Sequence, residues 1–170
     1  ARTAFQQARG ATSDFPGKAE VQRRLNLLGE SAEEGKKRTP EELERLEQEQ
    51  PGDVVILTRL GEAYEQNGLP KEAAAAYERA LKVNPKLLAA RFQLAKLYAG
   101  PLHASEKALA LAKAARALAP NDIEATFLVA KLAYDTGNHT WAYDLLRELA
   151  RQRATDPAIL CSLGWAAYAL

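Results

Sequence analysis

The 170-residue sequence has no methionine and only one cysteine, Cys161. A single thiol cannot form an intrachain disulfide, and it does not identify the cellular compartment. Because the sequence starts with alanine and lacks methionine, we expect a fragment or a processed form, and removal of a leader or membrane anchor is one route to it. For this soluble chain the cytoplasm and the bacterial periplasm both stay open as locations.

Long apolar runs are missing as well, and none approaches the roughly 20 residues that a membrane-spanning helix needs. No charge of either sign dominates, because 23 Lys and Arg stand against 22 Asp and Glu, for a net charge of +1. This balance gives no electrostatic reason for binding nucleic acid or anionic lipid. We therefore expect no nucleic-acid partner and no direct membrane contact in this part of the protein.

Motifs that carry chemistry are also absent. The chain has no glycine-rich phosphate loop and no GxSxG nucleophile motif. His103 and His139 fall in expected turns, without the paired Cys or HxxxH spacing of a metal site. Cys161 lies in an alanine-rich segment, where we expect a small buried thiol rather than a nucleophile. The sequence therefore predicts no enzyme, no metal and no cofactor.

What the sequence does have is alanine at regular intervals. Alanine supplies much of the 47% hydrophobic content while Val and Ile are few, which favours helices over sheets. A Leu-small pair recurs in steps of 34, 35 and 34 residues, at Leu60-Gly61, Leu94-Ala95, Val129-Ala130 and Leu163-Gly164. A tyrosine follows the first two pairs at Tyr64 and Tyr98, and later copies place Ala133 and Ala167 there. Small residues also recur in the second half of each unit, at Ala73, Ala108 and Ala142.

This period and pattern resemble the tetratricopeptide repeat family. Residues 54–87 match best, residues 88–122 carry one inserted residue, and residues 123–156 have Ala154 in place of the closing proline. Residues 157–170 match only the first helix of a fourth unit. The resemblance implies an all-α fold, a right-handed superhelical solenoid of antiparallel helix pairs.

Each unit should contain two helices, because glycine and proline separate two apolar-periodic segments. The small residues would set the distance between facing helices, and neighbouring pairs must stack because one pair cannot bury its apolar face alone. Asp122 and Asn138 are expected N-caps, and Gly68 and Gly137 expected breaks. The expected helices cover residues 54–66, 70–82, 88–99, 104–118, 122–135 and 139–153.

The amino-terminal third departs from this pattern. Residues 1–17 show no sustained period and are expected to form a loosely ordered arm. Residues 18–53 are interpreted as a degenerate first helical pair, with one helix around Leu28 and the other at 40–50. Thr39 as N-cap and Pro40 in the first turn define the start of that second helix. Its many acids indicate either a solvated helix face or an acidic docking strip.

The resemblance implies that the first helices of the units line the concave side of the superhelix. Four places on each first helix would face inward, and they predict a partner-binding groove formed by Thr58, Glu62, Glu65, Phe92, Lys96, Phe127, Lys131, Tyr134, Trp165 and Tyr168. Aromatic rings beside ammonium groups suit a peptide with apolar anchors and an acid. Alternatively, the Phe side chains complete the core. Trp165 and Tyr168 are either exposed only by truncation or bind another subunit.

The groove lacks the carboxylate clamp of chaperone-binding family members, because the corresponding places hold Thr58, Glu62, Glu124 and Leu128. The leading hypothesis is a noncatalytic protein-protein interaction scaffold that binds a peptide or partner protein in the concave groove. A second is a self-associating structural module, which would make the protein a homo-oligomer. A third is the repeat region of a larger enzyme or envelope-assembly protein whose active part is absent.

Overall fold

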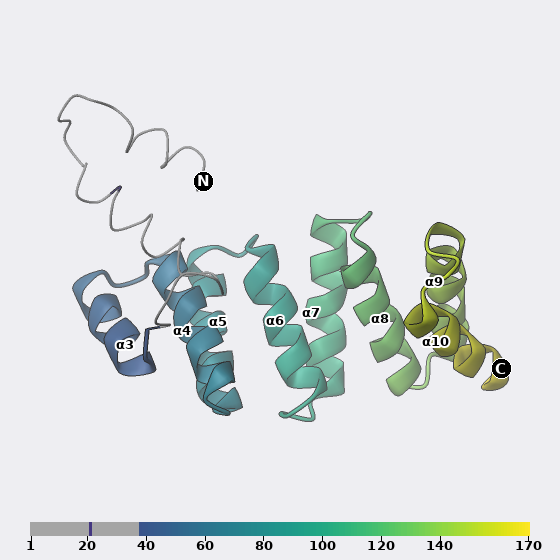
Figure 1. The fold of residues 1–170 in the computed structure, drawn as a ribbon, viewed down its shortest axis with the longest axis horizontal. Helices are drawn as coiled ribbons and strands as arrows, with labels where there is room; N and C mark the ends of the chain where they lie inside the picture. Colours follow the sequence, from purple (N-terminus) through teal and green to yellow (C-terminus); the bar gives the residue numbers. More distant parts are fainter. Residues whose placement is uncertain (1–20, 22–37) are drawn as a thin grey trace.

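The computed structural model describes Val21 and residues 38–170. All regular structure in this described part is α-helical, and successive helices stand side by side in a row (Figure 1). The helices are α3 (Pro40–Glu49), α4 (Val54–Gln66), α5 (Pro70–Val83), α6 (Leu88–Ala99), α7 (Ser105–Leu118), α8 (Ile123–Asp135), α9 (His139–Gln152) and α10 (Pro157–Tyr168). The expected arm at 1–17 and the expected helix around residue 28 lie outside the described residues.

Local sequence signals determine where the helices begin and end. From α4 to α9 every bound lies within one residue of its predicted position. Thr39 is the N-cap of α3, as predicted, and it forms a capping box with Glu42. The carboxylate of Asp122 caps α8, and the side-chain oxygen of Asn138 caps α9 by accepting a hydrogen bond from the Trp141 amide. These predictions are confirmed because capping depends on residues only two or three positions apart.

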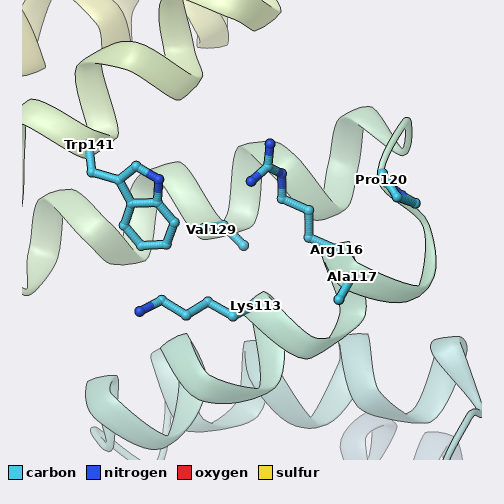
Figure 2. A pocket seen from close by; sticks show the side chains of 6 residues that line it. All are labelled: Lys113, Arg116, Ala117, Pro120, Val129 and Trp141. Atoms are coloured by element: carbon cyan, nitrogen blue, oxygen red, sulfur yellow. The ribbon is translucent and has the colours of Figure 1, made fainter.

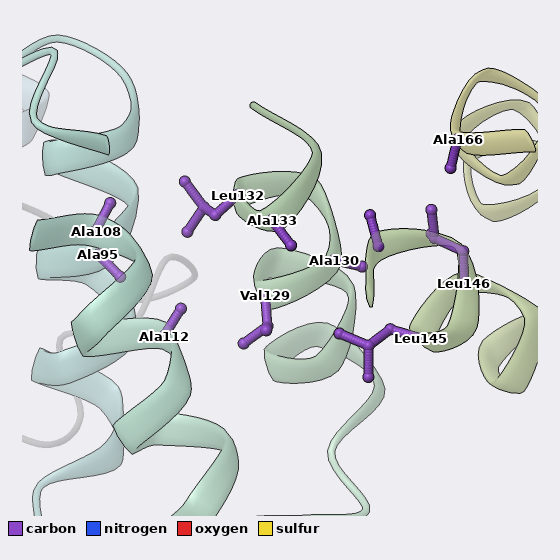
Figure 3. Packing of buried hydrophobic residues seen from close by; sticks show 11 residues of the cluster. Ala95, Ala108, Ala112, Val129, Ala130, Leu132, Ala133, Leu145, Leu146 and Ala166 are labelled. Carbon is purple, nitrogen blue, oxygen red and sulfur yellow. The ribbon is translucent and has the colours of Figure 1, made fainter. Parts of the chain in front are cut away.

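Each helix packs against the next one along the chain, and α8 also contacts α10. The core accordingly forms a series of clusters along the row rather than one central mass. Figure 3 shows the cluster between α6 and α10, where Ala95, Ala108 and Ala112 lie on the side facing Val129 and Leu132, and Ala130 lies toward Leu145 and Leu146. This arrangement is the predicted helical solenoid.

The recurring small residues allow a facing helix to approach closely in some units but not in others. A Cβ atom added at Gly61 would lie 2.7 Å from the ring of the buried Tyr77, so only glycine fits there. Ala95 and Ala130, at the equivalent places, are fully buried. Gly164 contradicts the prediction, because a Cβ there would meet no atom within 4 Å. No helix in the described part covers that face of α10.

Tyrosines join one unit to the next. Tyr64 and Tyr98 each pack against two successive core clusters. The Tyr64 hydroxyl donates a hydrogen bond to Glu44 on α3, and the Tyr98 hydroxyl donates to Glu78 on α5. Each of these hydrogen bonds therefore connects a first helix to the second helix of the preceding unit. Within the described residues, no helix is long and apolar enough to cross a bilayer.

Candidate functional site

The residues of the predicted groove lie on the first helix of each unit, α4, α6, α8 and α10. None of them is fully buried. The half-buried ones are Thr58, Glu62, Glu65, Phe92, Phe127 and Tyr134, and the exposed ones are Lys96, Lys131, Trp165 and Tyr168. The prediction that these residues lie at the surface is therefore consistent with their exposure. Their contacts show which of them already interact with other residues of the protein.

Glu65 and Lys96 meet at one cavity between the first two units. The cavity has a volume of about 430 Å³ and is also lined by Gly68, Pro70, Leu97 and Pro101. Its walls therefore combine apolar surface with one acidic and one basic side chain. Polar groups of this kind, placed in a mostly apolar concavity, fix the orientation of a ligand.

Glu65 is held in place by the core beneath it. The buried Tyr77 hydroxyl donates a hydrogen bond of 2.6 Å to Glu65 Oε1. Burial, and then this hydrogen bond to a carboxylate, raise the pKa of Tyr77 well above its ordinary value. The phenol therefore stays protonated and orients one carboxylate oxygen of Glu65.

The two phenylalanines of the groove are each paired with a lysine one helical turn along. Lys96 Nζ lies 4.4 Å from the centre of the Phe92 ring, and Lys131 Nζ lies 6.0 Å from that of Phe127. Phe127 also packs against the core cluster. Both rings are half-buried, so a role in partner binding and a role in the core are compatible. One edge of such a ring can pack against the core while another part of the ring stays accessible.

Other predicted groove residues already have partners within their own helix or turn. The Thr58 hydroxyl donates to the Val54 carbonyl oxygen at 2.7 Å. Glu62 forms an ion pair with Arg59 at 2.7 Å. The ring of Tyr134 contacts that of His139, with centroids 4.9 Å apart. These side chains contribute shape to the surface, whereas Glu65 and the Phe-Lys pairs contribute charge and aromatic faces.

The prediction that Cys161 is buried is wrong, because the thiol is exposed. Its place on α10 is the one that Phe92 and Phe127 occupy on α6 and α8, so it lies on the face of the predicted groove and not on the packing face. Nearby, Trp165 is 59% and Tyr168 is 85% exposed, and their rings make an edge-to-face contact at 6.3 Å. The composition of α10 is apolar, but composition does not show which side of a helix is covered.

Sequence reasoning missed a second cavity, shown in Figure 2, which lies between the second helices of two units. Its volume is about 300 Å³, and its lining residues are Lys113, Arg116, Ala117, Pro120, Val129 and Trp141. Aligning the second helices would have shown the charge reversal at this place, since Lys113 and Arg116 stand where α3 has Glu44 and Glu47, but not the cavity itself.

Comparisons with known proteins agree with this architecture. The family model described as "Tetratricopeptide repeat" matches residues 54–87. No curated protein matches the chain by sequence. Three similar solved structures show the fold alone, because each is less than 25% identical to the chain.

The first is MamA, at 15% identity and a TM-score of 0.71, covering 99% of this chain and 81% of MamA. The second is YrrB, described as a TPR protein with an unusual peptide-binding site, at 19% identity and a TM-score of 0.70, covering 99% and 84%. The third is a thermophilic TPR protein of Thermus thermophilus, at 22% identity and a TM-score of 0.58, covering 98% and 89%. The chain therefore carries a tetratricopeptide repeat at residues 54–87 and has the solenoid fold of tetratricopeptide repeat proteins.

Proposed function

We propose that this protein is a noncatalytic interaction scaffold that binds a peptide segment of a partner protein along the face of its first helices. The observation that carries the proposal is the cavity of about 430 Å³ flanked by Glu65 and Lys96. Its position between neighbouring units continues the row of Phe-Lys pairs on α6 and α8. The peptide-binding site named for YrrB supports this use of the fold.

The chemistry of the face indicates the kind of peptide. Apolar side chains of the peptide would contact Phe92 and Phe127, and its acidic groups would approach Lys96 and Lys131. Glu65, oriented by Tyr77, would accept a hydrogen bond from a backbone amide or a basic side chain. In this proposal the binding units are residues 54–87, 88–122 and 123–156, with 157–170 as part of a fourth.

The test is a double variant, Phe127→Ala with Lys131→Glu, in selections from a displayed peptide library. We expect the selected peptides to lose about tenfold or more in affinity, because one aromatic contact and one charge pair are removed. Circular dichroism should show the same helix content for the variant and the native protein.

The matched control is Tyr143→Ala with Arg147→Glu. This is another aromatic-cation pair one turn apart, with the guanidinium 5.6 Å from the ring centre, but it lies on α9, a second helix. The control should bind the selected peptides as the native protein does. Equal affinity in all three proteins would refute the proposal.

Self-association is a second candidate function, and the surface of α10 favours it. Leu160, Trp165, Tyr168 and Leu170 are 44%, 59%, 85% and 65% exposed. Contiguous exposed apolar side chains often mark an interface. Light scattering over a range of concentrations should show a dimer that Trp165→Ser with Tyr168→Ser dissociates, and a constant monomer mass would rule this function out.

A further inference from the structure

The cavity between α7 and α9 brings two cationic side chains and an indole together. In Figure 2, Lys113 and Arg116 extend from α7, and Trp141 on α9 lies across the cavity from them. Lys113 Nζ is 4.7 Å from the centre of a Trp141 ring. Val129 lies at the base of the cavity between the two helices and is itself fully buried. The cavity therefore combines positive charge with apolar and aromatic surface.

The same position two units earlier holds a cavity of opposite charge. That cavity, of about 280 Å³, lies between α3 and α5 and is lined in part by Glu44, Glu47, Leu60 and Glu72. Each of these residues has a counterpart 69 residues later, namely Lys113, Arg116, Val129 and Trp141. The two cavities thus occupy equivalent places in the repeat, and the basic cavity has Lys113 and Arg116 where the acidic one has Glu44 and Glu47.

The two cavities also differ in how their charges are satisfied. In the acidic cavity Glu44 accepts a hydrogen bond from Tyr64, and Glu47 pairs with Arg79. In the basic cavity Arg116 Nη2 reaches Glu148 only at 4.0 Å, and Arg116 Nε is buried without a hydrogen-bond partner.

Lys113 is also left without an anion, since it forms no ion pair within the described part of the chain. A buried donor without a partner, such as Arg116 Nε, is uncommon and costly, whereas Lys113 is exposed to solvent. Among the described residues, the basic cavity therefore has donors without an anion at hydrogen-bonding distance, whereas Glu44 and Glu47 of the acidic cavity each have a partner within the protein.

We propose that this basic cavity binds the side-chain carboxylate of an acidic peptide segment from a partner protein. The carboxylate would accept hydrogen bonds from Arg116 and Lys113, and a neighbouring apolar side chain of the peptide would pack on Trp141. A volume of about 300 Å³ is at the small end for ligand cavities, which suits one or two side chains. This site is separate from the face of the first helices and does not depend on it.

Trp141 provides a local reporter for the test. A Trp165→Phe background leaves it as the single tryptophan, because the chain contains two. The probe is the end-blocked tetrapeptide Leu-Glu-Leu-Glu, and its counterpart Leu-Gln-Leu-Gln lacks the charge. We expect a saturable change in Trp141 emission with the first peptide, weakened by added salt, and about tenfold weaker binding of the second.

Variants separate binding from folding. Lys113→Gln with Arg116→Gln should weaken the acidic peptide about tenfold or more, whereas Lys71→Gln with Lys82→Gln, which removes the same charge from exposed positions on α5, should not change its affinity. If the first double variant does not fold, Lys113→Gln alone serves, because Lys113 is exposed. Three results would each overturn the proposal: no saturable emission change, equal affinity for both peptides, or equal loss in the α5 control.

Discussion

At the scale of single residues, the same place in the repeat has different requirements in different units. Gly61 faces Tyr77 so closely that a methyl group would overlap the ring, and Tyr77 is itself fully buried and bonded to Glu65. Gly164 has the equivalent place on α10 but open space around it. This repeat position therefore requires a small residue only where a neighbouring helix covers it.

This contrast predicts opposite effects for one substitution. Gly61→Ala should lower the free energy of unfolding by about 1–3 kcal/mol, because the added methyl overlaps a ring that cannot move away. Gly164→Ala should raise it by about 0.5–1 kcal/mol, because alanine stiffens the helix and meets nothing. Urea unfolding followed by circular dichroism measures both, and equal effects of the two substitutions would contradict the role assigned to Gly61.

At the scale of helices, hydrogen bonds from Tyr64 to Glu44 and from Tyr98 to Glu78 connect neighbouring units. Burial first, and then the bond to Glu44, raise the pKa of Tyr64 to about 12. For Tyr98 the bond to Glu78 is the larger cause and burial the second, and its pKa also rises to about 12. At the next junction the equivalent places hold Ala133 on α8 and Lys113 on α7, so neither the hydroxyl nor its carboxylate acceptor is present there.

These pKa values predict how stability depends on pH. The folded state holds the phenolic protons more tightly than the unfolded state, whose tyrosines titrate near 10.0. The stabilisation is therefore complete below that pH and is lost as the pH rises toward about 12. Tyr64→Phe with Tyr98→Phe should reduce this alkaline loss in urea unfolding without abolishing it, because the pKa of Tyr77 is raised as well. An unchanged pH dependence would show that the two hydroxyls do not contribute to it.

Ion pairs between second helices follow the repeat with reversed sign. Glu47 on α3 pairs with Arg79 on α5, and 69 residues later Arg116 on α7 faces Glu148 on α9. Between them, the equivalent places on α5 and α7 hold Leu81 and Ala114. Because the charged and uncharged pairs alternate along the array, they favour the native pairing of second helices over a pairing shifted by one unit.

A charge exchange tests this pairing. Glu47→Arg alone should lower the free energy of unfolding by up to about 1 kcal/mol, because it places two cations together on a partly exposed surface. Adding Arg79→Glu restores an ion pair with the polarity of α7 and α9, and should recover most of the loss. A double-mutant cycle in urea measures the coupling, and additive effects would mean that the pair contributes nothing.

At the scale of the whole molecule, contacts are local and the core is divided into successive clusters. Stability in such an array is close to a sum of unit and interface contributions. A destabilising substitution at one end of the array should therefore lower the stability of the other end only in part. Neighbouring clusters share Tyr64, Tyr98 and Leu111. These residues would transmit a loss of stability from one cluster to the next.

Hydrogen exchange can show this directly. Leu146→Ala removes a buried side chain from the cluster of α6 to α10 and should cost about 2–5 kcal/mol there. We expect amide protection to fall mainly in α8, α9 and α10 while α4 and α5 keep most of theirs. A uniform loss of protection across the helices would show that the array unfolds as one cooperative unit.

The sequence by itself determined the helices, their caps and the residues of the packing face, as Thr39, Asp122 and Leu60 illustrate. These features follow from patterns within one or two helical turns. The same pattern recurs in several units, which supported the prediction from the sequence alone. Only the tertiary structure decided that Cys161 is exposed, that Gly164 is open, and that Glu65 meets Lys96 across one cavity and Arg116 meets Trp141 across another. Such outcomes depend on which helix covers each face and on side chains that are about 25 to 30 residues apart in the chain. Periodicity within one segment carries no information about those distances.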